Sequence, residues 1–195
     1  MNTEEMLRLN GIHIAPYIQL ATALIGKTRE GGGNMFRHQI DTMSVLIDYG
    51  YIDSVLLKAS LVHDILEDIP EFNHNLLITI DYESPDVYQL VLEVTRRPDE
   101  KKADFLTRIL TNGSDNAKVL KVADRISNMI SLGFVNKPEF IERYTKETVD
   151  YIFPIAEQID IIMLKELESL VESRRKYSEI FAKEVVHTFH FPDKA

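Results

Sequence analysis

One stretch of this sequence, from Asp53 or Ser54 to about Asp68, most restricts what the chain can fold into. Asp53 or Ser54 can cap the start of a helix, and Pro70 follows its end. The apolar residues of this stretch cover most of the circumference of a helix, which is typical of a buried helix. Yet four ionisable residues stand together near its C-terminal end: His63, Asp64, Glu67 and Asp68. Because burying such groups without partners costs free energy, the sequence predicts a compensating charge beside them.

Two further residues can complete a metal site with this helix. His38 lies on an expected helix upstream, and Asp124 lies on a later one. Together with His63 and Asp64 they offer imidazole and carboxylate ligands that suit one divalent cation and leave positions open for water and substrate. The chain has no cysteine, which excludes thiolate ligands and cysteine nucleophiles. The structural alternatives are a buried His63-Asp64 pair and a simple ion pair between Asp124 and Lys121.

The rest of the sequence predicts helices almost throughout. Apolar periodicity, capping residues and glycine or proline breaks mark expected helices at 12–25, 37–49, 53–68, 84–95, 101–110, 114–132, 138–159 and 161–186. Three consecutive glycines predict a loop at 27–34. We find no strand series, and a chain of 195 residues suits one domain. We therefore expect an all-α helical bundle with a single domain, its core at about 12–186 and a loose tail at 187–195.

The composition limits the possible partners. The formal net charge of −9 argues against nucleic acid, whose phosphate backbone favours a basic surface, but it permits a small anionic substrate in a locally basic pocket. No apolar run approaches the length of a membrane span, so no membrane partner is expected. Residues 1–10 carry charges and lack the apolar stretch of a signal peptide. A cytoplasmic protein is the expectation, and the oligomeric state is left open.

The order His38, His63-Asp64, Asp124 is that of the HD phosphohydrolases. Within them, the sequence resembles the alarmone (ppGpp) hydrolase domains of the RelA/SpoT type and their small stand-alone relatives, including the metazoan SpoT homologue. The matching segments are residues 61–68, 93–95, 122–129 and 147–156, and the resemblance extends from about residue 29 to residue 170. The first and third segments are specific for this branch, because many other HD enzymes lack the Glu-Asp pair that follows His-Asp.

This resemblance implies a metal-dependent pyrophosphohydrolase that removes the 3′-diphosphate of ppGpp or a close relative. The family's metal ligands match His38, His63, Asp64 and Asp124. The metal is usually Mn²⁺, although Fe²⁺, Zn²⁺ or Co²⁺ would also suit these donors. The catalytic acidic pair of the family matches Glu67 and Asp68. Arg29 matches an arginine that faces the substrate, and Asn128 matches an asparagine that contacts the nucleotide.

Local spacing agrees with these roles. Glu67 and Asp68 each follow a predicted ligand by four residues, so on a continuous helix both acids would rise on the side of the ligands. An acidic pair in that place can orient an attacking water or take its proton. Asn128 follows Asp124 at the same spacing, which places both on one helix face.

Several positions depart from the family pattern. Gln39 stands where the family usually has proline, Ser127 where it usually has histidine, and the loop at 29–34 also differs. The differences lie where a nucleotide would bind, so two other functions stay open. One is hydrolysis of another phosphorylated nucleotide, such as NADPH at its 2′-phosphate or a nucleoside monophosphate; the other is a non-catalytic nucleotide sensor, against which the acidic pair argues. We find no synthetase segment, so we expect an enzyme that only degrades its substrate.

A run of cations between residues 96 and 102 allows two interpretations. Its members are Arg96, Arg97, Lys101 and Lys102. They could form a rim that binds phosphate, but a charge run is more often a solvated face, and that is the interpretation we favour here.

Overall fold

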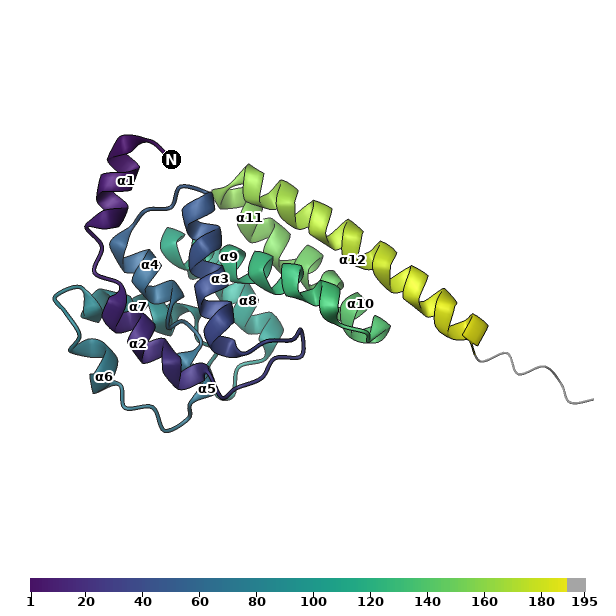
Figure 1. Ribbon diagram of the computed structural model, residues 1–195, viewed down its shortest axis with the longest axis horizontal. Coiled ribbons are helices and arrows are strands. Elements are labelled where there is room, and N and C mark those ends of the chain that lie inside the picture. The colour runs from purple at the N-terminus through teal and green to yellow at the C-terminus, as the bar shows by residue number, and fades with distance from the viewer. Residues whose placement is uncertain (189–195) are drawn as a thin grey trace, which may run out of the picture.

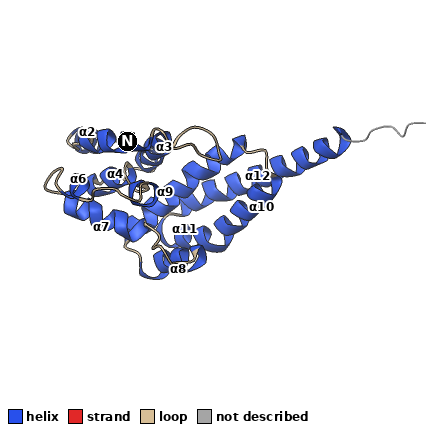
Figure 2. Ribbon diagram, turned by 90° about the horizontal axis from the view of Figure 1, so that it is seen from below, coloured by secondary structure: helices blue, strands red, loops and turns tan. Residues whose placement is uncertain are grey.

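Helices make up nearly all of the regular structure of this chain (Figure 1). The computed structural model describes the backbone of residues 1–188 and the side chains of residues 1–180. Within that part we find no strand, and an isolated antiparallel bridge joins Thr28 to Asn34 (Figure 2). The expected all-α fold is thereby confirmed. Among the same residues, no helix combines the length and the apolar character needed to cross a membrane.

The α-helices follow one another with short connections. In chain order they are α1 (Thr3–Asn10), α2 (Ala15–Ala21), α3 (Met35–Asp48), α4 (Ser54–Ser60), α5 (Ile65–Asp68), α6 (Asn75–Ile78), α7 (Ser84–Val94), α8 (Lys102–Asn112), α9 (Asp115–Ser131), α10 (Pro138–Glu147), α11 (Phe153–Ile159) and α12 (Ile161–Thr188). Three further turns are η1 (Thr22–Leu24) and η2 (Leu132–Phe134), both 3₁₀, and η3 (Thr148–Ile152), a π-helical turn. Expected helix positions are confirmed within a few residues for α3, α7, α8 and α9, whereas α1 and α6 were not expected.

The expectation of one continuous helix at 53–68 is wrong. The chain forms α4, then a turn at residues 61–64, and then α5. In that turn Leu61 and Val62 donate backbone hydrogen bonds to the carbonyls three residues earlier, which is 3₁₀ rather than α spacing. The segment is nevertheless buried as expected, because Leu57, Leu61 and Ile65 are fully inaccessible to solvent. Because of this break, His63 and Asp64 lie in a turn and not on the face of a continuous helix.

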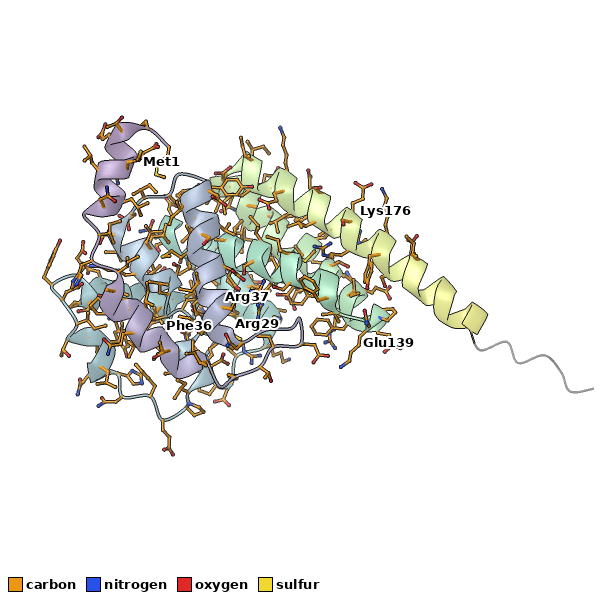
Figure 3. The ribbon with its side chains drawn as sticks, viewed as in Figure 1. Met1, Arg29, Phe36, Arg37, Glu139 and Lys176 are labelled. Atoms are coloured by element: carbon orange, nitrogen blue, oxygen red, sulfur yellow. The ribbon has the colours of Figure 1, made fainter. Side chains whose placement is uncertain are left out.

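The glycine loop at residues 27–34 is confirmed, and its conformation explains its composition. Gly32 and Gly33 have φ values of 81° and 73°, in the left-handed region that side chains disfavour. A Cβ on Gly31 would lie 3.2 Å from the Cβ of Ser131 at the end of α9. The loop therefore lies directly against α9, which brings Arg29 close to that helix (Figure 3).

Helix α9 is the centre of the arrangement. It contacts α3, α4, α7, α11 and α12, and most of its residues are buried (Figure 1). Helix α4 also packs against α7, and α10 lies beside α12. The elements that carry His38, His63-Asp64 and Asp124, namely α3, the turn after α4 and α9, thus meet at one place in the core.

The C-terminal helices differ from the sequence interpretation in detail. The single helix expected at 138–159 is divided into α10, the π-helical turn η3, and α11. Helix α12 presents charged side chains to solvent, among them the exposed pair of Lys176 and Glu172 (Figure 3). Its backbone continues to Thr188, two residues into the expected tail, and residues 189–195 lie outside the described part.

Candidate metal centre and pocket

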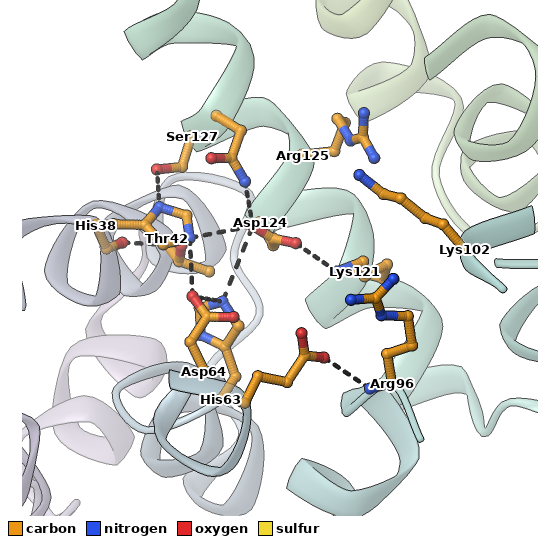
Figure 4. Close-up of polar contacts among 12 residues, drawn as sticks. His38, Thr42, His63, Asp64, Arg96, Lys102, Lys121, Asp124, Arg125 and Ser127 are labelled. Atoms are coloured by element: carbon orange, nitrogen blue, oxygen red, sulfur yellow. Dashed lines mark hydrogen bonds and ion pairs between the residues drawn. The ribbon is translucent and has the colours of Figure 1, made fainter. Parts of the chain in front are cut away.

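Three separate elements bring three potential metal ligands together (Figure 4). His38 comes from α3, His63 from the turn after α4, and Asp124 from the middle of α9. All three side chains are buried, and one donor atom of each lies within 4.8 Å of the others. The predicted ligands at these positions are therefore juxtaposed, although they lie far apart in the sequence.

Asp64, the fourth predicted ligand, lies at the edge of this group. Its Oδ2 is 3.2 Å from Nε2 of His63 and 3.5 Å from Nε2 of His38. On the other side, Oδ1 of Asp124 lies 3.1 Å from Nε2 of His38 and 3.9 Å from Nε2 of His63. Both imidazole Nε2 atoms therefore face carboxylate oxygens. A lone pair on Nε2 and a carboxylate oxygen repel each other, so this arrangement is stable only with a positive charge between them.

The hydrogen bonds of the histidines leave their Nε2 atoms available for a cation. Nδ1 of His63 lies 2.8 Å from the backbone carbonyl oxygen of Ser60, which can only accept, so Nδ1 carries the proton and donates. Nε2 of His63 is buried and has no hydrogen-bond partner. Nδ1 of His38 lies 3.0 Å from the hydroxyl of Ser127, which can accept in the same way. Metal-binding histidines in proteins are oriented by hydrogen bonds of this kind.

The charges of the centre also favour a cation. Burial alone would lower the pKa of His63, but the carboxylates of Asp64 and Asp124 raise it to about 9. Burial would raise the pKa of Asp124, but Lys121 and the two histidines hold it well below its usual value. Two carboxylates and two imidazoles at these distances suit a divalent ion with nitrogen and oxygen ligands. The donor set, the tautomer of His63 and its unpartnered Nε2 all fit a bound metal.

Three side chains support the carboxylates from outside the ligand group. Gln39 donates from its amide to Oδ2 of Asp64 at 2.9 Å. Lys121 donates to Oδ2 of Asp124 at 2.7 Å, and the amide of Asn128 donates to its Oδ1. The ion pair between Lys121 and Asp124 was foreseen as an alternative to metal binding, but the structure combines it with contacts to both histidines. Sequence reasoning missed the role of Gln39, which it noted only as a departure from the family pattern.

A pocket of about 260 Å³ opens beside the centre. It reaches the ligand group at His38, Asp64 and Asp124, and its floor and walls come from α3, α8, α9, α10 and the segment after α7. Its remaining lining residues are Arg29, Met35, Glu67, Arg96, Lys102, Phe105, Lys121, Arg125, Asn128 and Tyr144. The pocket thus joins a candidate metal site to a mixed surface of aromatic and charged side chains.

The predicted acidic pair is divided between two environments. Glu67 lines the pocket, and its Oε1 accepts a hydrogen bond from the backbone N–H of Arg96 at 2.6 Å. Asp68 is not among the lining residues; its Oδ1 pairs with Lys27, while its Oδ2 is buried without a partner. The break after α4 explains the difference, because the two acids do not continue the face of a regular helix from the ligands.

The two predicted substrate contacts lie together in the pocket. The guanidinium of Arg29 donates to the side-chain oxygen of Asn128 and, at 3.4 Å, to the hydroxyl of Ser131. Asn128 in turn donates to Asp124, so Arg29 is linked to the ligand group through one amide. Lys121 and Arg125 are further cations of the pocket that the sequence did not assign to it, whereas Lys102 belongs to the charge run for which a phosphate-binding rim was the less favoured interpretation. Arg96 and Lys102 are exposed, as a solvated run would be, but they also line the pocket.

Fold and site together define an all-helical domain with the His, His-Asp, Asp pattern of the HD phosphohydrolases. Known proteins agree with this class. The chain is 29% identical over 152 residues to the guanosine-3′,5′-bis(diphosphate) 3′-pyrophosphohydrolase of Haemophilus influenzae, covering 74% of this chain and 22% of that protein. It is 29% identical over 161 residues to the bifunctional (p)ppGpp synthase/hydrolase SpoT of Escherichia coli, covering 79% and 23%. A probable 3′-pyrophosphohydrolase of Mycoplasma pneumoniae is 31% identical over 151 residues, covering 70% and 20%.

The chain spans about a fifth of the length of these curated relatives. No family model matches it. Among solved structures, a metazoan ortholog of SpoT that hydrolyzes ppGpp has the same fold, with a TM-score of 0.66, 22% identity, and coverage of 82% of this chain and 96% of that one. The predicted resemblance to the alarmone hydrolases is therefore confirmed in both sequence and fold.

Proposed function

We propose that this protein is a metal-dependent (p)ppGpp 3′-pyrophosphohydrolase, which cuts the bond between the 3′-oxygen and the diphosphate of a guanosine alarmone. The observation that carries the proposal is the buried group of His38, His63 and Asp124 beside a pocket lined by Glu67 and Asn128. The resemblance to the alarmone hydrolases matches these residues to the family's motif, which supports the proposal. A small nucleotide, rather than nucleic acid, also suits a protein of net charge −9 with a locally basic pocket.

The metal would be held by His38, His63, Asp64 and Asp124, with Mn²⁺ as the first candidate. When bound, a divalent ion lowers the pKa of a coordinated water and offsets charge on phosphoryl oxygens. The chain's own residues prepare the site for it. Ser60 fixes the tautomer of His63, and Lys121 holds one oxygen of Asp124, so that the Oδ1 atom faces the histidines.

Glu67 is the candidate for moving the proton of the attacking water. Its carboxylate lies in the pocket, and the backbone N–H of Arg96 holds one of its oxygens, which leaves the other available. We keep Asp68 as the second member of the acidic pair, acting beside Glu67, although Lys27 engages one of its oxygens. Assistance by a positioned acid or base is worth roughly 10² to 10⁴ in rate.

Arg29 and Asn128 are the candidates for holding the nucleotide. They contact each other across the pocket between the glycine loop and α9, and Asn128 also touches Asp124. A base or ribose bound at this pair would place its 3′ substituent toward the ligand group. Because the glycine loop lies directly against α9, these two residues are held in register by packing as well as by their hydrogen bond.

Product analysis tests the proposed function. Purified protein with Mn²⁺ should convert ppGpp to GDP and pyrophosphate in equal amounts, measured by anion-exchange chromatography. Stepwise release of orthophosphate would contradict the proposal and indicate an ordinary phosphatase. The same screen should include NADPH and nucleoside monophosphates, because Gln39, Ser127 and the glycine loop differ from the family near the nucleotide site. Release from none of these compounds would favour the non-catalytic sensor.

A further inference from the structure

Four cations gather on the side of the pocket opposite the histidines (Figure 4). We call this group the cationic wall: Arg96, Lys102, Lys121 and Arg125. With Arg29, the pocket is lined by five cationic side chains against three carboxylates, those of Asp64, Glu67 and Asp124. The carboxylates lie at or next to the candidate metal centre. Lys121 is already paired with Asp124, so the positive charge that the proposed chemistry does not use belongs to Arg96, Lys102 and Arg125.

Arg125 fixes the position of this wall. Its side chain is 2% exposed, and its guanidinium stacks on Tyr144 at 4.2 Å from the ring centre. Nη2 pairs with Glu147 at 2.6 Å and Nη1 donates to the hydroxyl of Thr148 at 3.1 Å, while Nε is buried without a partner. Both acceptors lie where α10 gives way to the π-helical turn η3. The guanidinium of Arg125 is therefore held in place at the pocket, but one of its donors, Nε, lacks a hydrogen-bond partner.

Lys102 pairs with the same carboxylate as Arg125, that of Glu147, and its side chain is open to solvent. Its Nζ lies 3.0 Å from Oε1 of Glu147, the oxygen that also pairs with Arg125, and its side chain is 49% exposed. One carboxylate thus serves two cations. Partial burial lowers the pKa of Lys102, and the nearby charges of Arg125 and Lys121 lower it further, while Glu147 opposes them. A group in this position gains from an added anion.

We propose that Lys102, Arg96 and Arg125 form an anion subsite that binds a phosphate group of the substrate that is not cleaved. This inference rests on the proposed function, in which the scissile diphosphate lies at the metal centre. The ligand class is a nucleotide with a second phosphate or diphosphate group remote from the scissile one. Arg96 and Lys102 supply exposed charges, and Arg125 supplies a buried one beside them.

The subsite separates the possible substrates by their chemistry. A guanosine alarmone keeps its 5′ phosphates while the 3′-diphosphate is removed, and NADPH keeps its pyrophosphate bridge while a 2′-phosphate is removed. A nucleoside monophosphate has one phosphate, so it can occupy the metal centre or the subsite but not both. The structure therefore assigns this pocket to substrates with two separated anionic groups.

Kinetics with paired substrates test the subsite. The pair is ppGpp and guanosine 3′-diphosphate, which lacks the 5′ phosphates. Lys102→Met should lower kcat/KM for ppGpp by roughly tenfold or more, mainly through KM, and leave guanosine 3′-diphosphate within about twofold, because charged hydrogen bonds of this kind are worth at least that factor. Lys102→Arg, which keeps the charge, should recover most of the loss. Lys101→Met is the matched control, since Lys101 is exposed and does not line the pocket.

Titration of the Mn²⁺-loaded protein with GDP separates this inference from the proposed function. GDP carries the uncleaved diphosphate and no scissile group. If ppGpp is not hydrolysed but GDP binding weakens about tenfold in Lys102→Met, the subsite stands and the proposed function fails. If ppGpp is hydrolysed and Lys102→Met affects both substrates equally or neither, the subsite is overturned and the function stands. Neither hydrolysis nor GDP binding by the wild type would overturn both.

Discussion

The side-chain amide of Gln39 donates a hydrogen bond to Oδ2 of Asp64, the carboxylate oxygen that faces Nε2 of both His38 and His63. Gln39 is fully buried, and its own Oε1 has no partner. A buried amide that leaves one acceptor unsatisfied lowers the free energy of unfolding, so Gln39 is kept at a cost in stability. We infer that Gln39 is kept because it holds Asp64 in place for a metal.

Gln39→Leu should therefore weaken metal binding more than it weakens the fold. We expect Mn²⁺ affinity, measured by isothermal titration calorimetry, to fall about 10- to 100-fold, as is typical when a residue that orients a ligand is removed. The free energy of unfolding of the metal-free protein should change little, because the substitution also removes an unsatisfied acceptor. Ser44→Ala, at an exposed position of the same helix, is the control. Unchanged Mn²⁺ affinity in Gln39→Leu would show that the amide has no part in the metal site.

Removing a ligand itself should abolish bound metal. His63→Ala and Asp124→Ala each delete one of the few donors of the group, and the remaining ligands would be left as buried polar groups. Elemental analysis of the purified variants measures the effect directly. The stabilisation that added Mn²⁺ gives the wild type in a thermal melt should also disappear. Stoichiometric metal in both variants would contradict the assignment of these ligands.

An ion pair outside the metal centre gives a prediction on pH. Glu100 accepts hydrogen bonds from Nε and Nη2 of Arg108 at 2.7 and 2.9 Å, and these bonds lower the pKa of Glu100 to about 2. Arg108 also donates to the carbonyls of Glu93 and Thr95, so the pair anchors the segment that carries Arg96 to the pocket. Because the folded-state pKa lies below the ordinary value of 4.5, the ionised pair stabilises the fold above about pH 4.5 and loses this effect as the pH falls towards 2.

Glu100→Gln should accordingly lower the free energy of unfolding at pH 7 by about 1 kcal/mol, less than the pKa shift alone would give because the pair is partly open to solvent. The difference from the wild type should shrink between about pH 4.5 and pH 2, where the wild-type carboxylate becomes protonated. Urea unfolding at a series of pH values measures it. Glu172→Gln, which breaks an exposed pair with Lys176, should change stability little at any pH. A constant difference across the whole range would rule out the proposed ionisation.

The sequence predicted the grouping of the candidate metal ligands better than their surroundings, for a physical reason. His38, His63, Asp64 and Asp124 stand in a fixed order on elements that the apolar pattern already marks as buried, so burial and charge together indicate a cation. The cationic wall was found only in part: the charge run at 96–102 allowed a phosphate-binding rim with Arg96 and Lys102, but nothing in the sequence indicated Arg125. Arg125 belongs to the same helix as Asp124, but its partners Glu147 and Thr148 come from a later part of the chain, and only packing brings them together.

The break between α4 and α5 was missed because no local sequence signal indicates it. Residues 54–68 contain no glycine or proline, and their apolar pattern fits a continuous helix. In the structure Nδ1 of His63 approaches the carbonyl of Ser60, and the backbone tightens to 3₁₀ spacing around it. The backbone therefore departs from the helical conformation that the local sequence favours, at the point where His63 is oriented by its hydrogen bond to Ser60. The same break divides the acidic pair, which four-residue spacing placed on one face.

Glu67 and Asp68 should differ in their effects on turnover as a result. Glu67→Gln should lower kcat roughly 10²- to 10⁴-fold, because it removes the pocket carboxylate that can accept a proton. Asp68→Asn should lower kcat by about tenfold or less, because Asp68 pairs with Lys27 and does not line the pocket. Both amides keep the shape of the side chain, so metal content and GDP affinity should stay near wild type. The measurement is kcat with ppGpp, with metal content and GDP affinity determined on the same preparations. Turnover near the wild-type rate in Glu67→Gln would show that the pocket carboxylate is structural, whereas a larger loss in Asp68→Asn than in Glu67→Gln would assign the proton transfer to Asp68.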